Sequence, residues 1–336
     1  MLEKPDIQDQ ALISALSVEY GLVIADLAFL PLGADRNTAA YRAVAADGTA
    51  YFLKLRRGVF HEASVALPKI LGDQGVAHVI VPIEAQDGGL WASLDPFRLI
   101  LYPFVEGRDA YEVALSSGQW RDLGRAMRAI HAVTLPEGLS RSIRSETYSR
   151  RWCVALRQML ARAPMTSPID HVAAELIYFL ELRHDEIKRL IDRTERLAQW
   201  LRAEPPNHVL CHSDIHAGNV LVESGGTFYI VDWDEPILAP KERDLMFIGG
   251  GYWGDRQAPQ AEAWFYQGYG PTQIDARALA YYRYARAVED AALFCEHILD
   301  AEAGLADREQ SLRYLASSFE PGGAIQAAQA ADPDAL

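Results

Sequence analysis

Three polar residues in the middle of the chain have the types and the spacing that phosphoryl transfer requires. Asp214 and Asn219 stand five residues apart, and Asp232 follows thirteen residues later, directly after the apolar run Tyr229–Val231. Transfer of a phosphoryl group from ATP to a hydroxyl needs a carboxylate that orients the hydroxyl, and oxygen ligands that hold Mg²⁺ on the phosphates. Asp214 is therefore the candidate catalytic residue, and Asn219 and Asp232 are the candidate metal ligands.

The sequence around these residues favours a catalytic loop over an ordinary turn. Asp, Gly and Asn are common in surface turns, so the spacing of Asp214 and Asn219 alone would mean little. Short apolar segments of strand type, however, flank the loop on both sides: Val209–Leu210 precede it and Val220–Val222 follow it. A strand, a polar loop and a second strand form the context in which kinases present a catalytic Asp and a metal-binding Asn.

Length and composition allow one large domain or two lobes and argue against several other classes of protein. The chain has 336 residues, half of them hydrophobic, and no apolar run approaches the roughly 18 residues of a membrane span. The N-terminal residues have neither the basic nor the apolar segment of a signal peptide. Cys153, Cys211 and Cys295 lie far apart without a CxxC motif, which argues against a disulfide framework or a zinc site. We therefore expect a cytoplasmic protein.

The formal net charge of −14 bears on the partners of the protein. An acidic surface repels nucleic acid and anionic membranes, and it raises the local concentration of cations. Together with the candidate phosphotransfer residues, this charge favours a cationic small molecule as the substrate beside the nucleotide. We expect no nucleic acid or membrane partner, and we expect a monomer.

The order of strand and helix signals predicts an α+β protein with two lobes. A β-rich, nucleotide-binding lobe is expected at residues 1–105 and a mainly helical lobe with the catalytic loop and substrate pocket at 106–321. A hinge near 102–107 would join them, and a tail at 322–336, rich in Ala and Gln, would be a frayed helix end or disordered.

Within the first lobe, alternating apolar residues and turn residues predict short strands. Thr38–Val44 and Ala50–Leu55 flank Asp47-Gly48, which is a strong hairpin signal. A helix is expected at 61–74, although Pro68 conflicts with its interior. The other strands are expected at 27–32, 79–85, 90–94 and 98–105. The other helices are expected at 6–21, 117–133 and 170–201, and several more between about 258 and 319.

A lysine of the first lobe is the candidate anchor for the nucleotide. Lys54 lies in the strand directly after the hairpin, where kinases carry the lysine that contacts the inner phosphates of ATP. Alternation along the strand does not decide its face, so a solvated lysine is the alternative. Glu62, eight residues further on, is the candidate ion-pair partner of Lys54, although Pro68 makes the register of its helix uncertain.

Two further segments are candidates for contacts with the nucleotide. The loop between the first two strands could cover the phosphates with main-chain N–H groups, and Gly33 and Asn37 are its candidate residues. This loop has no GxGxxG pattern, and an ordinary hairpin connection is the alternative. Adenine is expected at Tyr102, Pro103 and Val105, where the carbonyl of Pro103 can accept a hydrogen bond and the N–H of Val105 can donate one.

The motifs of the chain resemble those of a known superfamily. HxDxxxxN at 212–219 with DxD at 232–234 is similar to the signature of the aminoglycoside phosphotransferase and choline kinase superfamily, and the resemblance covers most of the chain. It implies a protein-kinase-like fold with ATP and Mg²⁺ as cofactors. It also implies Asp214 as the catalytic base, Asn219 and Asp232 as the magnesium ligands, and Lys54 as the phosphate anchor. Segments 34–37, 239–247, 281–284 and 288–290 further resemble the members that phosphorylate spectinomycin.

The acceptor pocket is expected beside Asp214, and it should be acidic if the substrate carries ammonium groups. The candidate carboxylates lie on helices or just past the metal-binding Asp, and they are Asp185, Asp234, Glu235, Glu289 and Asp290. Each has an ordinary alternative as a solvated or capping charge. We expect His212 to brace the catalytic loop and His216 to be structural or solvent-facing.

Three functions fit these observations. The first is an ATP-dependent O-phosphotransferase that inactivates an aminocyclitol or aminoglycoside antibiotic, foremost spectinomycin, by direct transfer of the γ-phosphoryl group to a hydroxyl. The second is a metabolic kinase of the same superfamily, acting on choline, homoserine or a methylthiosugar. The third is a nucleotide-binding regulator without turnover, and the intact set of Lys54, Asp214, Asn219 and Asp232 argues against it.

Overall fold

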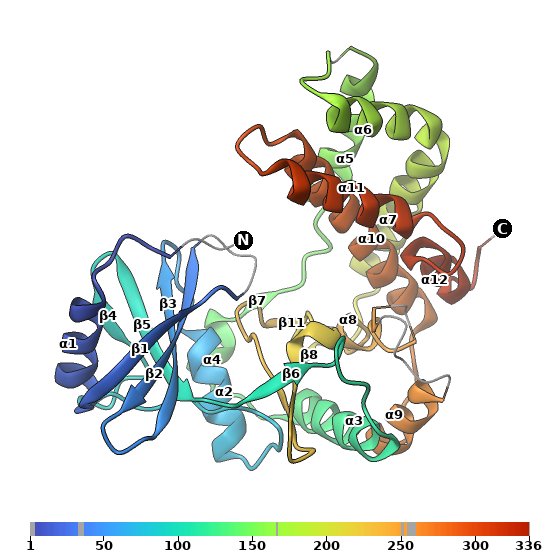
Figure 1. The fold of residues 1–336 in the computed structure, drawn as a ribbon. Coiled ribbons are helices and arrows are strands. Elements are labelled where there is room, and N and C mark those ends of the chain that lie inside the picture. Colours follow the sequence, from blue (N-terminus) through green and yellow to red (C-terminus); the bar gives the residue numbers. More distant parts are fainter. Residues whose placement is uncertain (1–3, 33–36, 166, 250–251, 254–259, 336) are drawn as a thin grey trace. The chain divides into compact units, whose positions relative to one another are not determined.

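The computed structural model describes residues 4–32, 37–165, 167–249, 252–253 and 260–335 (Figure 1). The chain divides into two compact units. The first unit comprises residues 1–143 and 217–236, and the second comprises 144–216 and 237–336. The chain thus starts in the first unit, passes into the second, returns to the first at 217–236 and ends in the second. These units divide the chain at points other than the expected lobe boundary near 105, and Asp214 belongs to a different unit from Asn219 and Asp232.

The first unit is built on a five-stranded antiparallel sheet with the strand order β1-β2-β3-β5-β4. The expected hairpin is confirmed between β2 and β3, where the Ala45 N–H donates to the Thr49 carbonyl at 2.8 Å. Gly48 has a φ of +88°, a left-handed conformation that glycine adopts without strain. The strands are β1 (Ile24–Leu30), β2 (Thr38–Ala45), β3 (Ala50–Arg57), β4 (Ala92–Leu94) and β5 (Phe97–Pro103).

Alternation along β3 decides which face carries its charged residues. Leu53 and Leu55 are fully buried in a core that also includes Leu12 and Leu16 of helix α1 (Asp9–Tyr20). Because successive side chains of a strand point to opposite faces, Lys54 and Arg56 lie on the face away from this core. The sequence alone did not decide which face of the strand carries Lys54.

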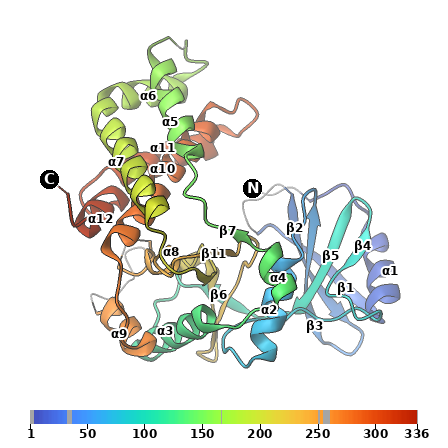
Figure 2. The same ribbon diagram turned by 180° about the vertical axis from the view of Figure 1, so that it is seen from behind.

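Helix α2 (Ala63–Asp73) forms in spite of the proline within it. Pro68 is buried there, and its missing N–H leaves the helix without the hydrogen bond to the carbonyl four residues earlier. Figures 1 and 2 show α1 and α2 on opposite sides of the sheet. The strand expected at 79–85 is wrong, because the described structure has only an isolated bridge of Val79 with Ile230 there. Pro82 lies within the segment and cannot donate to a strand ladder.

The candidate metal ligands lie just outside two strands of a second sheet in the first unit. This sheet consists of β6 (Gly107–Asp109), β9 (Val220–Glu223) and β10 (Phe228–Ile230) in the order β10-β9-β6. Asn219 precedes β9 and Asp232 follows β10. Helix α3 (Ser117–Ala132) follows β6 and begins with a capping box between Ser116 and Gln119. The short helix α4 (Glu137–Ser142) completes the unit.

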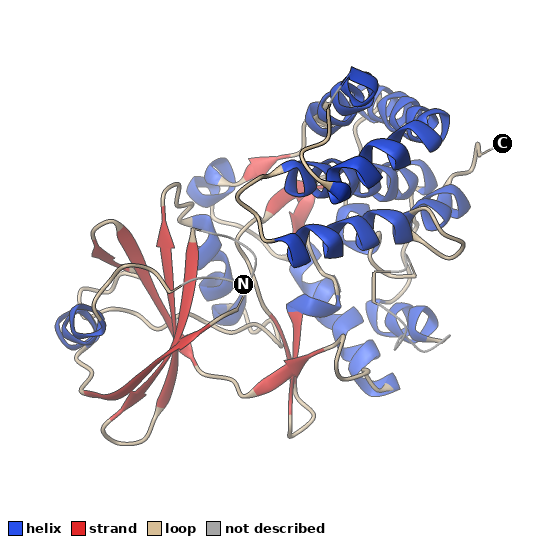
Figure 3. Cartoon of the chain, turned by 45° about the horizontal axis from the view of Figure 1, so that its top comes forward, coloured by secondary structure: helices blue, strands red, loops and turns tan. Residues whose placement is uncertain are grey.

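The second unit is mainly helical, as the colouring in Figure 3 shows. Its small sheet has β11 (Ile237–Ala239) between β7 (Arg144–Ser145) and β8 (Val209–Cys211). Helix α10 is its central helix and packs against α5, α7, α11 and α12. The helices are α5 (Arg151–Arg162), α6 (His171–Leu182), α7 (His184–Ala203), α8 (Glu242–Leu245), α9 (Ala261–Tyr269), α10 (Ala276–Leu299), α11 (Leu305–Ser318) and α12 (Ala324–Ala331).

Two parts of the second unit differ from the expectation. The helix expected at 170–201 is two helices, α6 and α7, that meet at Arg183. The expected tail contains α12, and Asp332 just after it binds Arg193 of α7, with 2.6 Å between the Arg193 Nε and an Asp332 carboxylate oxygen. None of the described helices has the length and apolar content needed to cross a membrane.

Candidate active site

Asn219 is held rigidly at the start of the β9–β10 hairpin. It ends a turn of 3₁₀ helix (Ala217–Asn219) and is buried. Its carbonyl accepts a hydrogen bond from the Val231 N–H at 3.0 Å, which ties it to the chain just after β10. The Ala110 N–H lies 3.0 Å from the carbonyls of both Ala217 and Val220, so β6 also fixes this turn.

Asp232 has a backbone conformation that sets it apart from its neighbours. Its φ is +64°, in the left-handed region, which Asp tolerates better than most residues. The next residue, Trp233, is buried, and its indole N–H donates to the Ile230 carbonyl at 3.3 Å. The tryptophan thus anchors the segment, whereas the side chain of Asp232 is 51% exposed. The carboxylate and the Asn219 amide offer oxygen ligands of the kind that Mg²⁺ prefers.

The lysine expected to anchor the nucleotide lies against the acidic residues of the DxD motif. Lys54 Nζ is 2.6 Å from Asp234 Oδ1 and 3.6 Å from Asp232 Oδ1. Asp234 also binds Arg56 through its other oxygen, Oδ2. Asp234, a candidate substrate contact, is therefore paired with two cations of β3. The sequence reading missed Arg56, although its position two residues after Lys54 places both on one face.

The other residues expected around the phosphates have different surroundings. Glu62 is exposed just before α2, and within the described residues it makes no contact with Lys54. Asn37 is exposed, and its carbonyl accepts a hydrogen bond from the Arg57 N–H at 2.9 Å. Gly33 lies outside the described residues. Their contacts with a nucleotide stay predictions.

The residues expected to bind adenine lie at and after the end of β5. Tyr102 pairs with Phe52 of β3, on the face of the sheet that carries Lys54. Burial and the nearby carboxylates of Asp234 and Asp232 raise the pKa of Tyr102. Pro103 is exposed and Val105 is half-buried, in the part of β5 and its connection that leads to β6.

In the second unit, two basic side chains contact the carboxylate of Asp214. Its Oδ1 lies 2.7 Å from an Arg286 guanidinium nitrogen, and its Oδ2 lies 3.4 Å from His216 Nε2. The Asp214 side chain is 34% exposed, so it is accessible in spite of these contacts. The sequence reading did not include Arg286, and it assigned His216 a structural or solvent-facing role. In the sequence, only the four-residue spacing of Arg286 and Asp290, which allows an ion pair on one helix, could have drawn attention to Arg286.

These contacts decide the charge of Asp214. Burial alone would raise the pKa of the Asp214 carboxyl, but the hydrogen bond from His216 and the charge of Arg286 outweigh it. The pKa is therefore lowered well below its usual range. Asp214 stays ionised at neutral pH, and it is a better hydrogen-bond acceptor than proton acceptor.

A buried carboxylate fixes the backbone of the catalytic loop. Asp244 of α8 is fully buried and accepts the N–H groups of His212 at 2.9 Å and of Ser213 at 2.6 Å. Ser213 has a φ of +76°, a conformation that a serine adopts only when its surroundings impose it. The Asp214 N–H faces His212 Nδ1 at 3.3 Å, so His212 has the bracing position that the sequence predicted.

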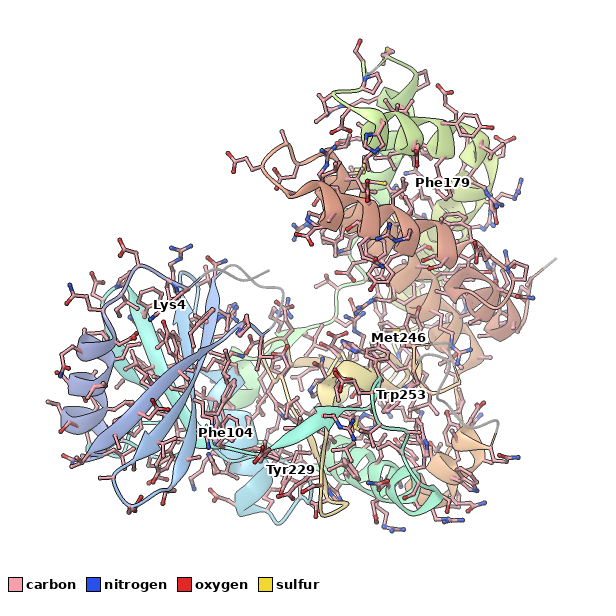
Figure 4. All side chains as sticks on the ribbon, viewed as in Figure 1. Lys4, Phe104, Phe179, Tyr229, Met246 and Trp253 are labelled. Carbon is pink, nitrogen blue, oxygen red and sulfur yellow. The ribbon has the colours of Figure 1, made fainter. Side chains whose placement is uncertain are left out.

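Arg286 is itself held in place by α10 and by the segment after α8. Its Nε lies 2.8 Å from Asp290 Oδ1, one helical turn further along α10. Its guanidinium also lies 5.6 Å from the ring centre of Phe247. Arg283, one turn earlier, donates to the carbonyls of Met246 and Ile248 and so fixes this segment. Figure 4 labels Met246 there.

The remaining acidic candidates have separate locations. Asp290 is linked to Asp214 through Arg286, which contacts both carboxylates, and Glu289 is half-buried beside it on α10. Asp185 lies in the first turn of α7, 3.0 Å from His184 Nδ1. Figures 1 and 2 show the start of α7 at the end of the helical unit away from β8 and α8. Glu235, in the first unit, is exposed next to Asp234.

The fold and these residues define an enzyme of the kinase-like class. Comparison with models of protein families identifies the family. Residues 28–287 match the model of the phosphotransferase enzyme family. The chain belongs to this family. A comparison with curated proteins found no match.

Two solved structures of a spectinomycin phosphotransferase are similar to nearly the whole chain. The complex with ADP and spectinomycin has a TM-score of 0.90 and 37% identity, and the match covers 97% of this chain and 99% of that chain. The AMP-bound complex has a TM-score of 0.85 and 36% identity, covering 96% and 98%. These similarities confirm the expected α+β, kinase-like fold.

A more distant relative supports the fold alone. The macrolide 2′-phosphotransferase from Brachybacterium faecium has a TM-score of 0.56 and is 20% identical, and the match covers 93% of this chain and 99% of that chain.

Proposed function

We propose that the protein is an ATP-dependent O-phosphotransferase that inactivates an aminocyclitol antibiotic, with spectinomycin as its substrate. The observation that carries this proposal is the 37% identity, over nearly the full length of both chains, to a spectinomycin phosphotransferase whose structure contains ADP and spectinomycin. The net charge of −14 supports a cationic acceptor, because an acidic protein attracts cations.

The proposed reaction is a direct transfer that needs little covalent chemistry from the protein. Lys54 would contact the inner phosphates of ATP, and Asn219 and Asp232 would hold Mg²⁺, which neutralises phosphate charge when bound. Asp214 would accept a hydrogen bond from the acceptor hydroxyl and so orient its oxygen toward the γ-phosphorus. Positioning and electrostatics then supply most of the rate enhancement.

The contacts of Asp214 support this role. Arg286 holds Oδ1 at 2.7 Å, whereas the contact of Oδ2 with His216 is longer, at 3.4 Å. Oδ2 is therefore the oxygen better placed to accept the substrate hydroxyl. The lowered pKa of Asp214 suits this role, because the loose transition state of phosphoryl transfer asks for orientation of the hydroxyl rather than for early removal of its proton.

The proposal also covers the cellular location and the oligomeric state of the enzyme. A cytoplasmic location would supply ATP, and it agrees with the three cysteines, which are buried and free. We further propose that the enzyme acts as a monomer.

An ADP-release assay with Mg²⁺-ATP tests the proposed substrate. Spectinomycin is compared with kanamycin, streptomycin, hygromycin, choline and homoserine, and a reaction without acceptor gives the background rate. We expect turnover above background with spectinomycin alone. Turnover with choline or homoserine, and none with any antibiotic, would make the protein a metabolic kinase and contradict the proposal.

A further inference from the structure

The carboxylate of Asp234 lies between two cations of the first unit. Its Oδ1 is 2.6 Å from Lys54 Nζ, and its Oδ2 binds the Arg56 guanidinium. All three side chains are largely buried, with exposed fractions of 15% for Lys54, 17% for Arg56 and 22% for Asp234. Charge-assisted hydrogen bonds of this kind are the strong ones in proteins, so Asp234 occupies much of the binding capacity of both cations.

The two cations stand on a rigid element. Strand β3 lies inside the sheet, paired with β2 on one side and β5 on the other. Lys54 and Arg56 point to the same face because they are two residues apart. Arg56 Nη1 also lies 3.4 Å from Thr38 Oγ1, at the first residue of β2. The cations therefore form a fixed pair, next to the place where the loop between β1 and β2 rejoins the sheet.

Asp234, in contrast, belongs to a segment without regular structure. Residues 231–236 lie between β10 and β11 and form no helix or strand. Trp233 is buried and anchors the segment, and Asp234 follows that anchor at a bend. A rotation of the Asp234 side chain would break its contacts with both cations without disturbing the sheet.

Resting on the proposed function, we propose that Asp234 holds the place of the nucleotide phosphates, and that Arg56 is a second phosphate-binding cation beside Lys54. Carboxylates and phosphates present anionic oxygens that accept the same hydrogen bonds from Lys and Arg. A nucleotide takes both cations by displacing the carboxylate of Asp234. The contact is thus an internal competitor that weakens nucleotide binding.

The proposal predicts that substitutions of Asp234 and of Arg56 change the affinity for ADP in opposite directions. Asp234→Asn keeps the shape of the side chain but removes the competing charge, so ADP should bind about three- to tenfold more tightly. Arg56→Gln removes a phosphate ligand, so ADP should bind about tenfold more weakly. In the double variant the gain from Asp234→Asn should shrink, because the two side chains act on each other.

Calorimetric titration with ADP in the presence of EDTA measures these effects without metal or acceptor. Arg57→Gln is the matched control for Arg56, since Arg57 is the next residue of β3 and is exposed on the opposite face. Asp26→Asn, at an exposed position on β1, controls for the loss of one negative charge in the same unit. Both controls should bind ADP as the wild type does. Asp234→Ala and titration with inorganic pyrophosphate provide a second variant and a second probe, and thermal unfolding verifies that each variant is folded.

Tighter binding by both Asp234 variants, with weaker binding by Arg56→Gln, is the expected result. Unchanged or weaker ADP binding by folded Asp234→Asn would overturn the proposal. A parallel titration with Mg²⁺ in place of EDTA tests the alternative role: a loss of ADP affinity confined to it would also overturn the proposal, because Asp234 would then be a metal ligand. Since the titration contains no acceptor, a protein that shows the expected affinities but phosphorylates no antibiotic would contradict the proposed function and leave this inference standing.

Discussion

At the scale of single residues, the proposed chemistry depends on how Asp214 is held. One oxygen is taken by Arg286, the other faces His216, and the lowered pKa keeps the carboxylate charged. Arg286 in turn is fixed by Asp290. Asp290, predicted as a substrate contact, thus pairs with the arginine that holds Asp214, and its contact with a substrate stays a prediction.

Substitution of Arg286 should lower the rate of transfer more than the binding of nucleotide. We expect Arg286→Gln to reduce kcat by about 10- to 100-fold, because Asp214 loses the contact that fixes its orientation. The pKa of Asp214 should rise, since burial raises it and the opposing charge of Arg286 is gone. The acid limb of the kcat profile should therefore move to higher pH.

Steady-state kinetics across a range of pH measures both effects. Arg286→Lys keeps the charge and should recover part of the lost rate. Arg277→Gln, on the same helix but beside Asp334 and not Asp214, is the control. An Arg286→Gln enzyme with the kcat and the pH profile of the wild type would show that the arginine has no part in positioning Asp214.

The residues that could be predicted from sequence are those with a fixed spacing along the chain. Asp214, Asn219, Asp232 and Lys54 were proposed as site residues in this way, because the loop and strand that carry them are short and local. Arg286 was missed because it comes from a helix more than 70 residues further along, and its contact depends on how α10 packs. The pairing of Asp234 with β3, across a separation of 180 residues, was missed for the same reason.

At the scale of elements, α8 fixes the loop that carries Asp214. This four-residue helix places Asp244 beneath the loop, where its two oxygens accept the N–H groups of His212 and Ser213. A fully buried carboxylate is tolerated there because the hydrogen bonds compensate for the lost hydration. The left-handed conformation of Ser213 depends on the same contacts.

Asp244→Asn should therefore reduce both stability and activity. The amide can accept at only one oxygen, and its NH₂ group would face a backbone donor, so we expect the free energy of unfolding to fall by about 3 kcal/mol or more. Urea unfolding measures this loss, and kcat should fall with it because the loop loses its support. Glu302→Gln removes a charge from an exposed position of the same unit and should leave both quantities unchanged. Wild-type stability of Asp244→Asn would contradict the bracing role.

Local signals predicted most elements, and the exceptions have physical reasons. The Asp47-Gly48 hairpin is confirmed because the turn residues themselves set its geometry. The apolar segment 79–85 resembles a strand, but Pro82 cannot take part in a ladder. The division of 170–201 into α6 and α7 at Arg183 was not predicted, since the segment contains neither Gly nor Pro to mark the end of a helix.

At the scale of the whole molecule, the proposed catalytic and metal-binding residues are divided between two units, and the chain passes from one unit to the other three times. The crossings lie near residues 143, 216 and 236. The second crossing lies between Asp214 and Asn219, so the segment that carries these two candidate residues is also a connection between the units. The sequence predicted two lobes from a change of periodicity, but the return of the chain at 217–236 depends on the pairing of β9 with β6, which no local pattern reveals.

The central claim is direct phosphoryl transfer to an acceptor hydroxyl that Asp214 orients, and one measurement tests it most directly. Wild-type protein and Asp214→Asn are incubated with Mg²⁺-ATP and spectinomycin, phosphorylated spectinomycin is quantified by mass spectrometry, and ADP affinity is measured on the same preparations. We expect the wild type to form the product and Asp214→Asn to lose about 10²- to 10⁴-fold in kcat. ADP binding should be unchanged. An Asp214→Asn enzyme that transfers phosphate as fast as the wild type would contradict the account.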